Sequence, residues 1–280
     1  MKSVFVTFAD GSPEMISAAK RLGNQAAKTG IFSEILVLND ALLSDLHSIY
    51  RRDLPKIQRL DSFPLHYRAS KAYAVQYTLG YAIGRFKTLC YMDAGNEIVV
   101  NRFSVRNLSS MIRLTEQEGG FAEQLPNPEF EYTKRELVEY LNPPQDDLNS
   151  GQVQATWFIM RVDAQNLELA SRWVELSNPD LNLWQNPSNL EAQSVGFKDH
   201  RRDQSIFSLL WKHYQYPTRP AIRDFRGIKN ASEPVQTRRN RTNDSEISYL
   251  TNTNVAGFLS STFIRIRDFK NKLLKFPYRP

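Results

Sequence analysis

The chain has 280 residues, with 41% hydrophobic and 24% charged side chains and a formal net charge of +6 at pH 7. This length can bury the core of one large α/β domain or two small ones, and a single cysteine, Cys90 inside an apolar run, excludes a disulfide scaffold. Because no apolar run is long enough for a transmembrane helix and the N-terminal one is too short for a signal peptide, we expect a soluble cytoplasmic protein.

The N-terminal part of the chain alternates between strand and helix patterns. The predicted elements are strands over 3–8 and 33–38 and helices over 13–29 and 39–50. Ser12 before Pro13 is typical of a helix start, and Gly30 is typical of a helix end. This β-α-β-α order predicts a parallel sheet with helices on its faces, whose ligands bind beyond the carboxyl ends of the strands.

The rest of the chain continues with helices, strands and one long loop. The predicted helices cover 67–84, 133–141, 163–177 and 204–214, the predicted strands cover 87–92, 119–125 and 151–162, and a loop rich in Pro and Asn covers 178–203. Thr133 and Glu136 have the spacing of a capping box at the start of their helix. The strand over 151–162 is long enough to lie in the centre of the sheet.

The strand over 87–92 leads into the sequence YMDAGNEI, so an acid and a glycine follow its last apolar residues. A carboxylate at the end of a buried parallel strand is where an α/β protein places a ligand or metal contact. Gly95 leaves room for close approach to Asp93. The alternative is an ordinary turn, because Asp and Gly are both turn formers, and the sequence leaves both interpretations open.

Three further polar clusters are candidates for a site. The stretch DHRRDQSIF places Asp203 at a helix start, where the dipole favours an ionised carboxylate with or without a catalytic role. The stretch HYRASK places Arg68 and Lys71 one turn apart, where they can hold phosphate or simply face solvent. The basic run TRRNR, 237–241, has the same two interpretations.

Several common catalytic motifs do not occur in the sequence. It has no Walker loop, no GxGxxG, no GxSxG and no HExxH, and no histidine pair with the spacing of a zinc helix. The common nucleotide-hydrolase, dehydrogenase, α/β-hydrolase and zinc-protease interpretations are therefore excluded. What remains is an α/β fold with an acid at a strand end.

Four stretches taken together, in chain order, resemble the GT-A type glycosyltransferases, including the glycogenin-like and exostosin-like groups. They are YRASKAYAVQYTL, YMDAGNEI, GQVQATWFIMR and HRRDQSIFSLL. The resemblance extends over residues 3–215. It implies a single Rossmann-like GT-A domain over 1–216, with a mixed, mostly parallel sheet flanked by helices. Residues 217–280, which are rich in Lys and Arg, are expected to form a basic extension that packs on this domain and could complete the site.

The resemblance implies a nucleotide-sugar site. In such enzymes the first βαβ unit holds the nucleoside, which corresponds here to Thr7, Phe8 and Asp10. Asp203 and Gln204 match an Asp-Gln pair that faces the donor sugar in related enzymes. Asp203 would act as a base toward the acceptor hydroxyl in an inverting reaction, or orient the sugar in a retaining one.

The resemblance also implies a divalent cation, Mn²⁺ or Mg²⁺, on the diphosphate. Asp93 matches the first acid of the metal-binding aspartate motif, but the second position is Gly95. One possibility is that Glu97 or a water supplies the missing ligand. The other is that protein cations replace part of the metal's work, for which the candidates are Arg68, Lys71 and Arg238.

The predicted reaction is transfer of a sugar from a UDP-sugar to a glycan or other hydroxyl acceptor, without a nucleic-acid partner. Residues 217–280 contain 13 of the 36 Lys and Arg residues and only 5 of the 30 Asp and Glu residues. The alternative function is a non-catalytic α/β binding protein whose basic tail binds RNA or an anionic membrane. The amphipathic segment 263–276 either packs on the domain or contacts a membrane peripherally.

Overall fold

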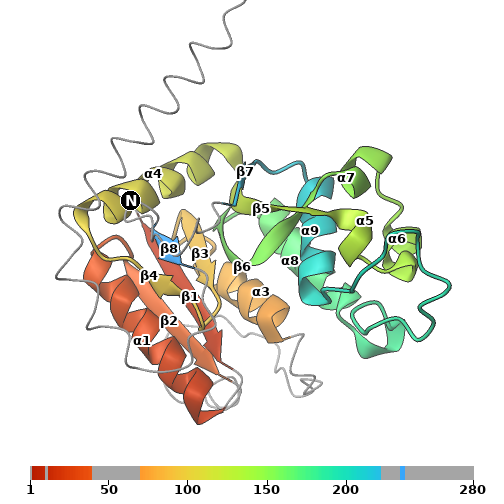
Figure 1. Cartoon of the computed structure of the whole chain (residues 1–280). Coiled ribbons are helices and arrows are strands. Elements are labelled where there is room, and N and C mark those ends of the chain that lie inside the picture. The colour runs from red at the N-terminus through yellow and green to blue at the C-terminus, as the bar shows by residue number, and fades with distance from the viewer. Residues whose placement is uncertain (1, 10–11, 40–69, 222–233, 237–280) are drawn as a thin grey trace, which may run out of the picture.

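The computed structural model describes residues 2–9, 12–39, 70–221 and 234–236, which form the coloured ribbon in Figure 1. Apart from Asn39, the predicted helix over 39–50 lies outside these residues. The basic run 237–241 and the amphipathic segment 263–276 also lie outside them. None of the described helices is long and apolar enough to cross a membrane.

A six-stranded sheet forms the centre of the fold. Its strands are β1 (Ser3–Ala9), β2 (Glu34–Asn39), β3 (Thr88–Met92), β5 (Gly120–Pro128), β6 (Gly151–Arg161) and β7 (Thr218–Pro220). Their order across the sheet is β2-β1-β3-β6-β5-β7, and only β6 runs antiparallel to its neighbours. The sheet is therefore mixed and mostly parallel, as predicted, with β6 near its middle.

A second, two-stranded sheet lies beside the first. It pairs β4 (Glu97–Ile98) with β8 (Val235–Gln236) in antiparallel register. Both β7 and β8 belong to the C-terminal extension, and each pairs with a strand from the first 216 residues. The described parts of the extension are thus joined to the domain by backbone hydrogen bonds.

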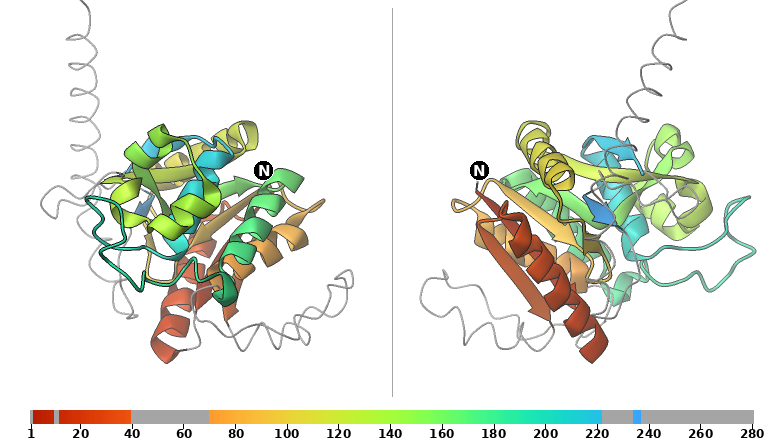
Figure 2. Two further views of the ribbon diagram at one scale, coloured as in Figure 1. Left: turned by 90° about the vertical axis from the view of Figure 1, so that its right-hand side faces the viewer. Right: turned by 60° about the vertical axis from the view of Figure 1, so that its left-hand side comes forward.

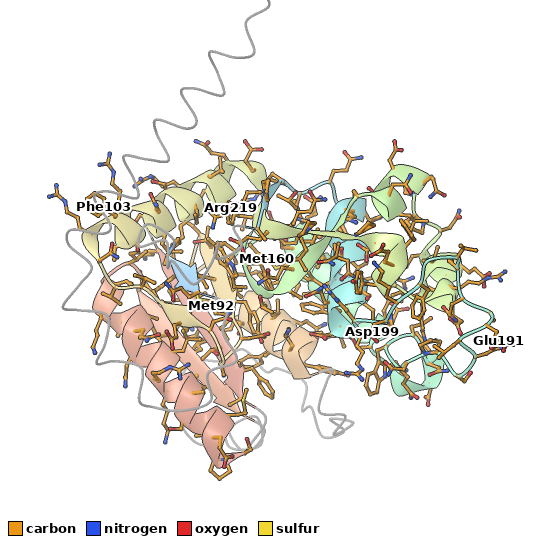
Figure 3. The ribbon with its side chains drawn as sticks, viewed as in Figure 1. Met92, Phe103, Met160, Glu191, Asp199 and Arg219 are labelled. Carbon is orange, nitrogen blue, oxygen red and sulfur yellow. The ribbon has the colours of Figure 1, made fainter. Side chains whose placement is uncertain are left out.

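Helices cover both faces of the sheet (Figure 2). They are α1 (Pro13–Thr29), α3 (Ser70–Ala82), α4 (Arg102–Glu118), α5 (Glu129–Tyr132), α6 (Arg135–Leu141), α7 (Gln145–Asn149), α8 (Ala164–Leu176) and α9 (Asp203–His213), with a 3₁₀ turn at Pro179–Leu181. The long loop predicted over 178–203 is confirmed apart from that turn. Helix α4 was not predicted from the sequence.

The core has two halves because successive side chains of a strand point to opposite faces of the sheet. Phe5, Cys90 and Trp157 pack on one face with apolar residues of α1 and α4. Val6 and Phe158 pack on the other face with α3, α8 and α9. Cys90 is a fully buried free cysteine, as expected for a small core residue, and burial raises the pKa of its thiol.

An aromatic cluster fixes α9 against β6. The ring centroids of Phe158 and Phe207 lie 4.6 Å apart, and that of Trp173 on α8 lies 4.9 Å from Phe207. Both Phe207 and Trp211 are fully buried. Because large buried aromatic side chains contribute strongly to packing, this cluster determines where the N-terminus of α9 lies relative to the sheet.

The helix caps were predicted with mixed success. Ser12 caps α1 by accepting a hydrogen bond from the backbone N–H of Met15, and Gly30 ends the helix in the left-handed conformation, as predicted. The capping box at Thr133 is wrong: α6 starts after Lys134 without a side-chain cap, and the Thr133 hydroxyl donates to Glu129 at 2.6 Å. The Thr133 hydroxyl is directed at the buried Glu129 carboxylate, and α6 begins one residue later than the capping box requires.

Candidate active site

The candidate site lies at the carboxyl ends of β1 and β3, which are neighbours in the sheet. Val6 on β1 is paired with Tyr91 on β3, so both strands end at the same edge. Asp93 is the first residue after β3, and its backbone N–H donates to the carbonyl oxygen of Thr156 on β6 at 2.7 Å. The backbone at Asp93 is therefore fixed by the central strand.

The residues after Asp93 form a turn that is held by hydrogen bonds from a side chain of helix α1. The N–H of Asn96 donates to the carbonyl oxygen of Asp93 at 2.9 Å, which closes the turn around Gly95. The buried guanidinium of Arg21 donates to the carbonyl oxygens of Ala94 and Asn96 at 3.2 and 3.1 Å. The stretch is therefore a turn, and the ligand or metal contact at Asp93 stays a prediction.

Lys71 joins Asp93 to Asp203. Its Nζ lies 3.0 Å from Oδ1 of Asp93 and 2.8 Å from Oδ2 of Asp203. The same nitrogen donates to the carbonyl oxygen of Ala155 on β6 at 3.3 Å. Residues from the start of α3, the end of β3 and the start of α9 therefore meet at one ammonium group, which we call the Lys71 centre (Lys71, Asp93 and Asp203).

The electrostatics of the Lys71 centre keep its lysine charged. Burial opposes the charge, but the nearby carboxylates of Asp203 and Asp93 outweigh burial and raise the pKa of Lys71 well above its ordinary value. Burial raises the pKa of Asp93, Lys71 lowers it, and the like charge of Asp203 raises it. Together these effects raise the pKa of Asp93 overall, and with both acids ionised the two carboxylates and one ammonium carry one excess negative charge.

Tyr91 supports Asp93 from the sheet. Its hydroxyl donates to Oδ1 of Asp93 at 2.9 Å, while its ring stacks on Phe158 with centroids 5.1 Å apart. Burial, followed by the charge of Asp93, raises the pKa of Tyr91. The hydroxyl therefore stays protonated as a donor, which fixes one oxygen of the Asp93 carboxylate.

Asp203 is the first residue of α9, as predicted, and the helix N-terminus favours its negative charge. The preceding residue, Arg202, has φ 52° and ψ −115°, a backbone conformation that costs free energy for any residue except glycine. Strain of this kind is often found at functional sites, where the surrounding structure enforces it. The start of α9 is thus held in place against a local preference.

His200 anchors the loop that leads into α9. It is buried, its Nδ1 accepts from the backbone N–H of Lys134 at 3.3 Å, and its Nε2 lies 3.0 Å from the carbonyl oxygen of Leu183. These partners assign the proton to Nε2. Burial, aided by the charge of Lys134, lowers the pKa of His200 to about 4. The anchor is therefore a neutral imidazole.

Gln204, the second member of the predicted Asp-Gln pair, is tied to the sheet. Its Nε2 donates to Oε1 of Gln152 on β6 at 2.8 Å. Gln152 in turn donates to Glu129 at 3.0 Å, and this fully buried carboxylate also accepts from Lys212 at 2.7 Å. Gln204 therefore connects the start of α9 to a buried polar network.

The predicted nucleoside contacts are only partly described. Thr7 and Phe8 lie near the end of β1, and both are buried. Within the described residues, the hydroxyl oxygen of Thr7 has no hydrogen-bond partner. Asp10, Arg68 and Arg238 lie outside the described residues. The structure therefore brings together Lys71, Asp93 and Asp203, with Gln204 adjacent, and leaves the remaining predicted contacts as predictions.

The described side chains do not fit a divalent-metal site at Asp93. Glu97, the second predicted metal ligand, is 5% exposed on β4 and interacts electrostatically with Arg21. In the described ranges, no group of three or more His, Cys, Asp or Glu side chains could hold a metal ion. The oxygens of Asp93 are already engaged by Lys71 and Tyr91. The Mn²⁺ or Mg²⁺ cofactor stays a prediction.

Sequence reasoning missed three residues that position the site: Arg21, Tyr91 and Gln152. One of them left a signal. Arg21 lies next to Leu22 and three residues after Ala18, so a charged side chain interrupts the buried stripe of α1. A charge on such a stripe indicates a specific buried partner. Tyr91 and Gln152 follow ordinary strand patterns and gave no such signal.

A cavity of about 500 Å³ lies elsewhere in the molecule. It opens between α6, α7 and α8 and the C-terminal half of α9, and its lining includes Tyr140, Glu168 and Arg172. None of the predicted site residues lines it. The cavity is therefore at the other end of α9 from Asp203 and is separate from the Lys71 centre.

No family model matches the chain, and no curated protein matches it. One similar solved structure is a glycosyltransferase involved in the glycosylation of the major capsid of PBCV-1, with a TM-score of 0.43, 8% identity, and 79% of this chain and 82% of that chain covered. Another is mouse xyloside xylosyltransferase 1 in its apo form, with a TM-score of 0.40, 9% identity, and 79% and 85% covered. These values do not assign the chain to a family.

Proposed function

We propose that the protein is a glycosyltransferase that moves a sugar from a UDP-sugar to a hydroxyl group of a glycan or another acceptor. The observation that supports this best is the pairing of Asp93 and Asp203 through Lys71 at the carboxyl edge of a mostly parallel sheet. These are the two acids that the sequence resemblance implies. Their meeting was not required by any local pattern, because one follows a strand and the other starts a distant helix.

The charge of the Lys71 centre suits glycosyl transfer. The transition state carries positive charge on the donor sugar and negative charge on the leaving diphosphate. The excess negative charge of the centre stabilises positive charge on the sugar ring. Asp203 has a 29% exposed side chain and is the carboxylate that we place against the sugar or the acceptor hydroxyl.

We also propose which residues contact the nucleoside and the diphosphate of the UDP-sugar. Thr7, Phe8 and Asp10 are expected to contact the nucleoside beyond the end of β1. The leaving diphosphate needs positive charge, and the candidates outside the Lys71 centre are Arg68 and Arg238.

A hydrolysis and transfer screen tests the proposal. We expect turnover of one member of a set that contains UDP-glucose, UDP-galactose, UDP-xylose, their N-acetyl relatives and GDP-sugars. Asp203→Asn should lower that turnover by about 10²- to 10⁴-fold, the usual contribution of a positioned catalytic group. Asp146→Asn, at an exposed acid of α7, is the matched control and should change nothing. Thermal melts of all three proteins exclude unfolding as the cause.

The alternative, a non-catalytic binding protein with a basic tail, makes a different forecast. Calorimetry would then show no heat with UDP, with or without Mn²⁺, and the screen would find no turnover. A truncation before Pro217 that keeps its thermal melt but loses binding to RNA or to anionic liposomes would favour the alternative. UDP binding together with turnover would exclude it.

A further inference from the structure

We propose that Lys71 is a built-in cation that occupies the position between Asp93 and Asp203, so that no divalent cation binds between these two carboxylates and ligand binding at this centre needs none. Lys71 is then a positioning residue that holds two carboxylates from different elements in one geometry. The inference rests on the proposed function only in its choice of UDP as a probe. The claim about the metal concerns the three described side chains themselves.

The ammonium group of Lys71 makes all of its hydrogen bonds and ion pairs within the protein. A lysine ammonium has three N–H donors and no acceptor. Here the acceptors are Asp93 at 3.0 Å, Asp203 at 2.8 Å and the carbonyl oxygen of Ala155 at 3.3 Å. Every donor of Lys71 is therefore used within the protein, and each acceptor comes from a different element: the β3 end, the α9 start and β6.

The position of Lys71 excludes a second cation from the same place. A Mg²⁺ ion needs oxygen ligands at about 2.1 Å in nearly octahedral geometry. The facing oxygens of Asp93 and Asp203 already contact one nitrogen, and a metal between them would lie against the ammonium charge. The side chain of Lys71 is only 15% exposed, and its ammonium is held by Asp93, Asp203 and the carbonyl oxygen of Ala155.

Among the described residues, the two positions after Asp93 that the sequence offered for a second metal ligand do not supply one. The residue two positions after Asp93 is Gly95, which has no ligand to offer. Glu97 is buried on β4 and interacts with the charge of Arg21. The protein thus supplies its own positive charge beside Asp93, whose aspartate motif lacks a second acid at Gly95.

The same contacts define what the centre can bind. Because Lys71 has no N–H left to donate, the centre offers a ligand only the free lone pairs of its two carboxylates. Those oxygens accept hydrogen bonds from hydroxyl groups, and the excess negative charge of the centre repels phosphate. The ligand group at the Lys71 centre is therefore a sugar or acceptor hydroxyl, and the diphosphate must bind to other cations.

Titration with Mn²⁺, followed by the loss of its free EPR signal, tests the inference without any activity measurement. The wild-type protein should show no saturable site, and neither should Lys20→Ala, the matched control at an exposed lysine of α1. Lys71→Ala leaves two carboxylates facing each other and should gain a site that binds Mn²⁺ at least about 10-fold more tightly than wild type. Adding Asp203→Asn to Lys71→Ala should abolish that site.

One equivalent of Mn²⁺ bound by the wild-type protein and lost in Asp93→Asn would overturn the inference. If Lys71→Ala does not fold, as judged by its thermal melt, the wild-type titration still decides the question. It does so because a metal site at Asp93 predicts saturation and a built-in cation predicts none.

Calorimetry with UDP provides a second measurement on the unmodified protein. The dissociation constant should be the same within about 2-fold in EDTA and in MnCl₂, since 2-fold is well under 1.4 kcal/mol, the equivalent of a 10-fold change. An Mn²⁺ requirement that disappears in Asp93→Asn would overturn the inference, because that metal would be held at the Lys71 centre. Absence of UDP binding in both conditions would contradict the proposed function instead, and the Mn²⁺ titration would still test Lys71.

Discussion

The two regions that supply the aspartates to Lys71 are held in different ways. The turn after β3, residues 93–97, is fixed mainly through backbone groups: the carbonyl oxygens of Ala94 and Asn96 accept from Arg21, and Asp93 continues the pairing with β6. The start of α9, residues 200–204, is fixed mainly through side chains, of which His200 and Gln204 are the chief ones. It also contains a strained backbone at Arg202.

This difference indicates that the start of α9 depends more on solution conditions than the turn after β3 does. Backbone clamping depends little on pH, whereas an anchor made of a neutral imidazole fails when the imidazole becomes charged. The Asp93 side should therefore keep its geometry over a wide range of conditions, and the Asp203 side should be the first to loosen. Lys71 therefore connects Asp93, in a region that we expect to be insensitive to pH, with Asp203, in a region that we expect to be sensitive to it.

The largest expected effect tests whether the two halves act as one unit. Asp93→Asn and Asp203→Asn should each lower sugar-nucleotide turnover by about 10²- to 10⁴-fold. Because both carboxylates hold the same ammonium, the double variant should be little worse than the poorer single variant. Steady-state kinetics of the double-mutant cycle measure this, and strictly multiplicative losses would show that the two aspartates act independently.

A smaller effect distinguishes the two halves by pH. The pKa of His200 is about 4 in the folded protein against an ordinary 6.5, so the unfolded state binds the proton first as pH falls. Stability from the neutral imidazole is fully present above pH 6.5 and is lost progressively toward pH 4, by roughly 2 to 3 kcal/mol. Urea unfolding of wild type and His200→Gln at several pH values measures this. The variant should be less stable at pH 7.5 but should lose less stability over that interval.

Loss of the Arg21 hydrogen bonds to the turn after β3 should lower the stability of the protein already at neutral pH. Arg21→Met keeps the aliphatic stem but removes both hydrogen bonds to the turn, and it should lower the free energy of unfolding by about 2 kcal/mol. Arg113→Met, at an exposed arginine of α4, is the control and should cost less than about 0.5 kcal/mol. The loss should be present in full at pH 7.5, where the contribution of His200 is unchanged. A loss at pH 7.5 no larger than that of Arg113→Met would show that Arg21 does not hold the turn.

The smallest effect concerns the strain before Asp203. Arg202→Gly should raise the free energy of unfolding by about 1 kcal/mol, because glycine adopts this conformation without steric cost. Asn142→Gly is the control, since Asn142 ends α6 in an ordinary left-handed conformation that asparagine tolerates well. Equal changes in thermal melts of the two variants would show that Arg202 is not specially strained.

Local patterns predicted most of the described regular elements. The bounds of β1, α1, β3, β6 and α8 agree with the predicted ranges within a few residues, because apolar spacing and caps are read over one or two turns. Asp93 and Asp203 were likewise found from their places at a strand end and a helix start. The prediction of a capping box at Thr133 was wrong because a local motif takes no account of residues outside it. The Thr133 hydroxyl is bonded to the buried Glu129, which lies outside the predicted helix 133–141.

The sequence by itself determined that this is an α/β protein with an acid after a buried strand and another at a helix start. Three features became visible only in the folded chain: β6 runs antiparallel to its neighbours, Arg21 holds the turn, and Lys71 lies between the two acids. The reason is physical: propensity and periodicity act between residues a few positions apart. The Lys71 centre depends on long-range packing, in which the aromatic cluster beneath α9 brings Asp203 to a lysine more than a hundred residues earlier in the chain.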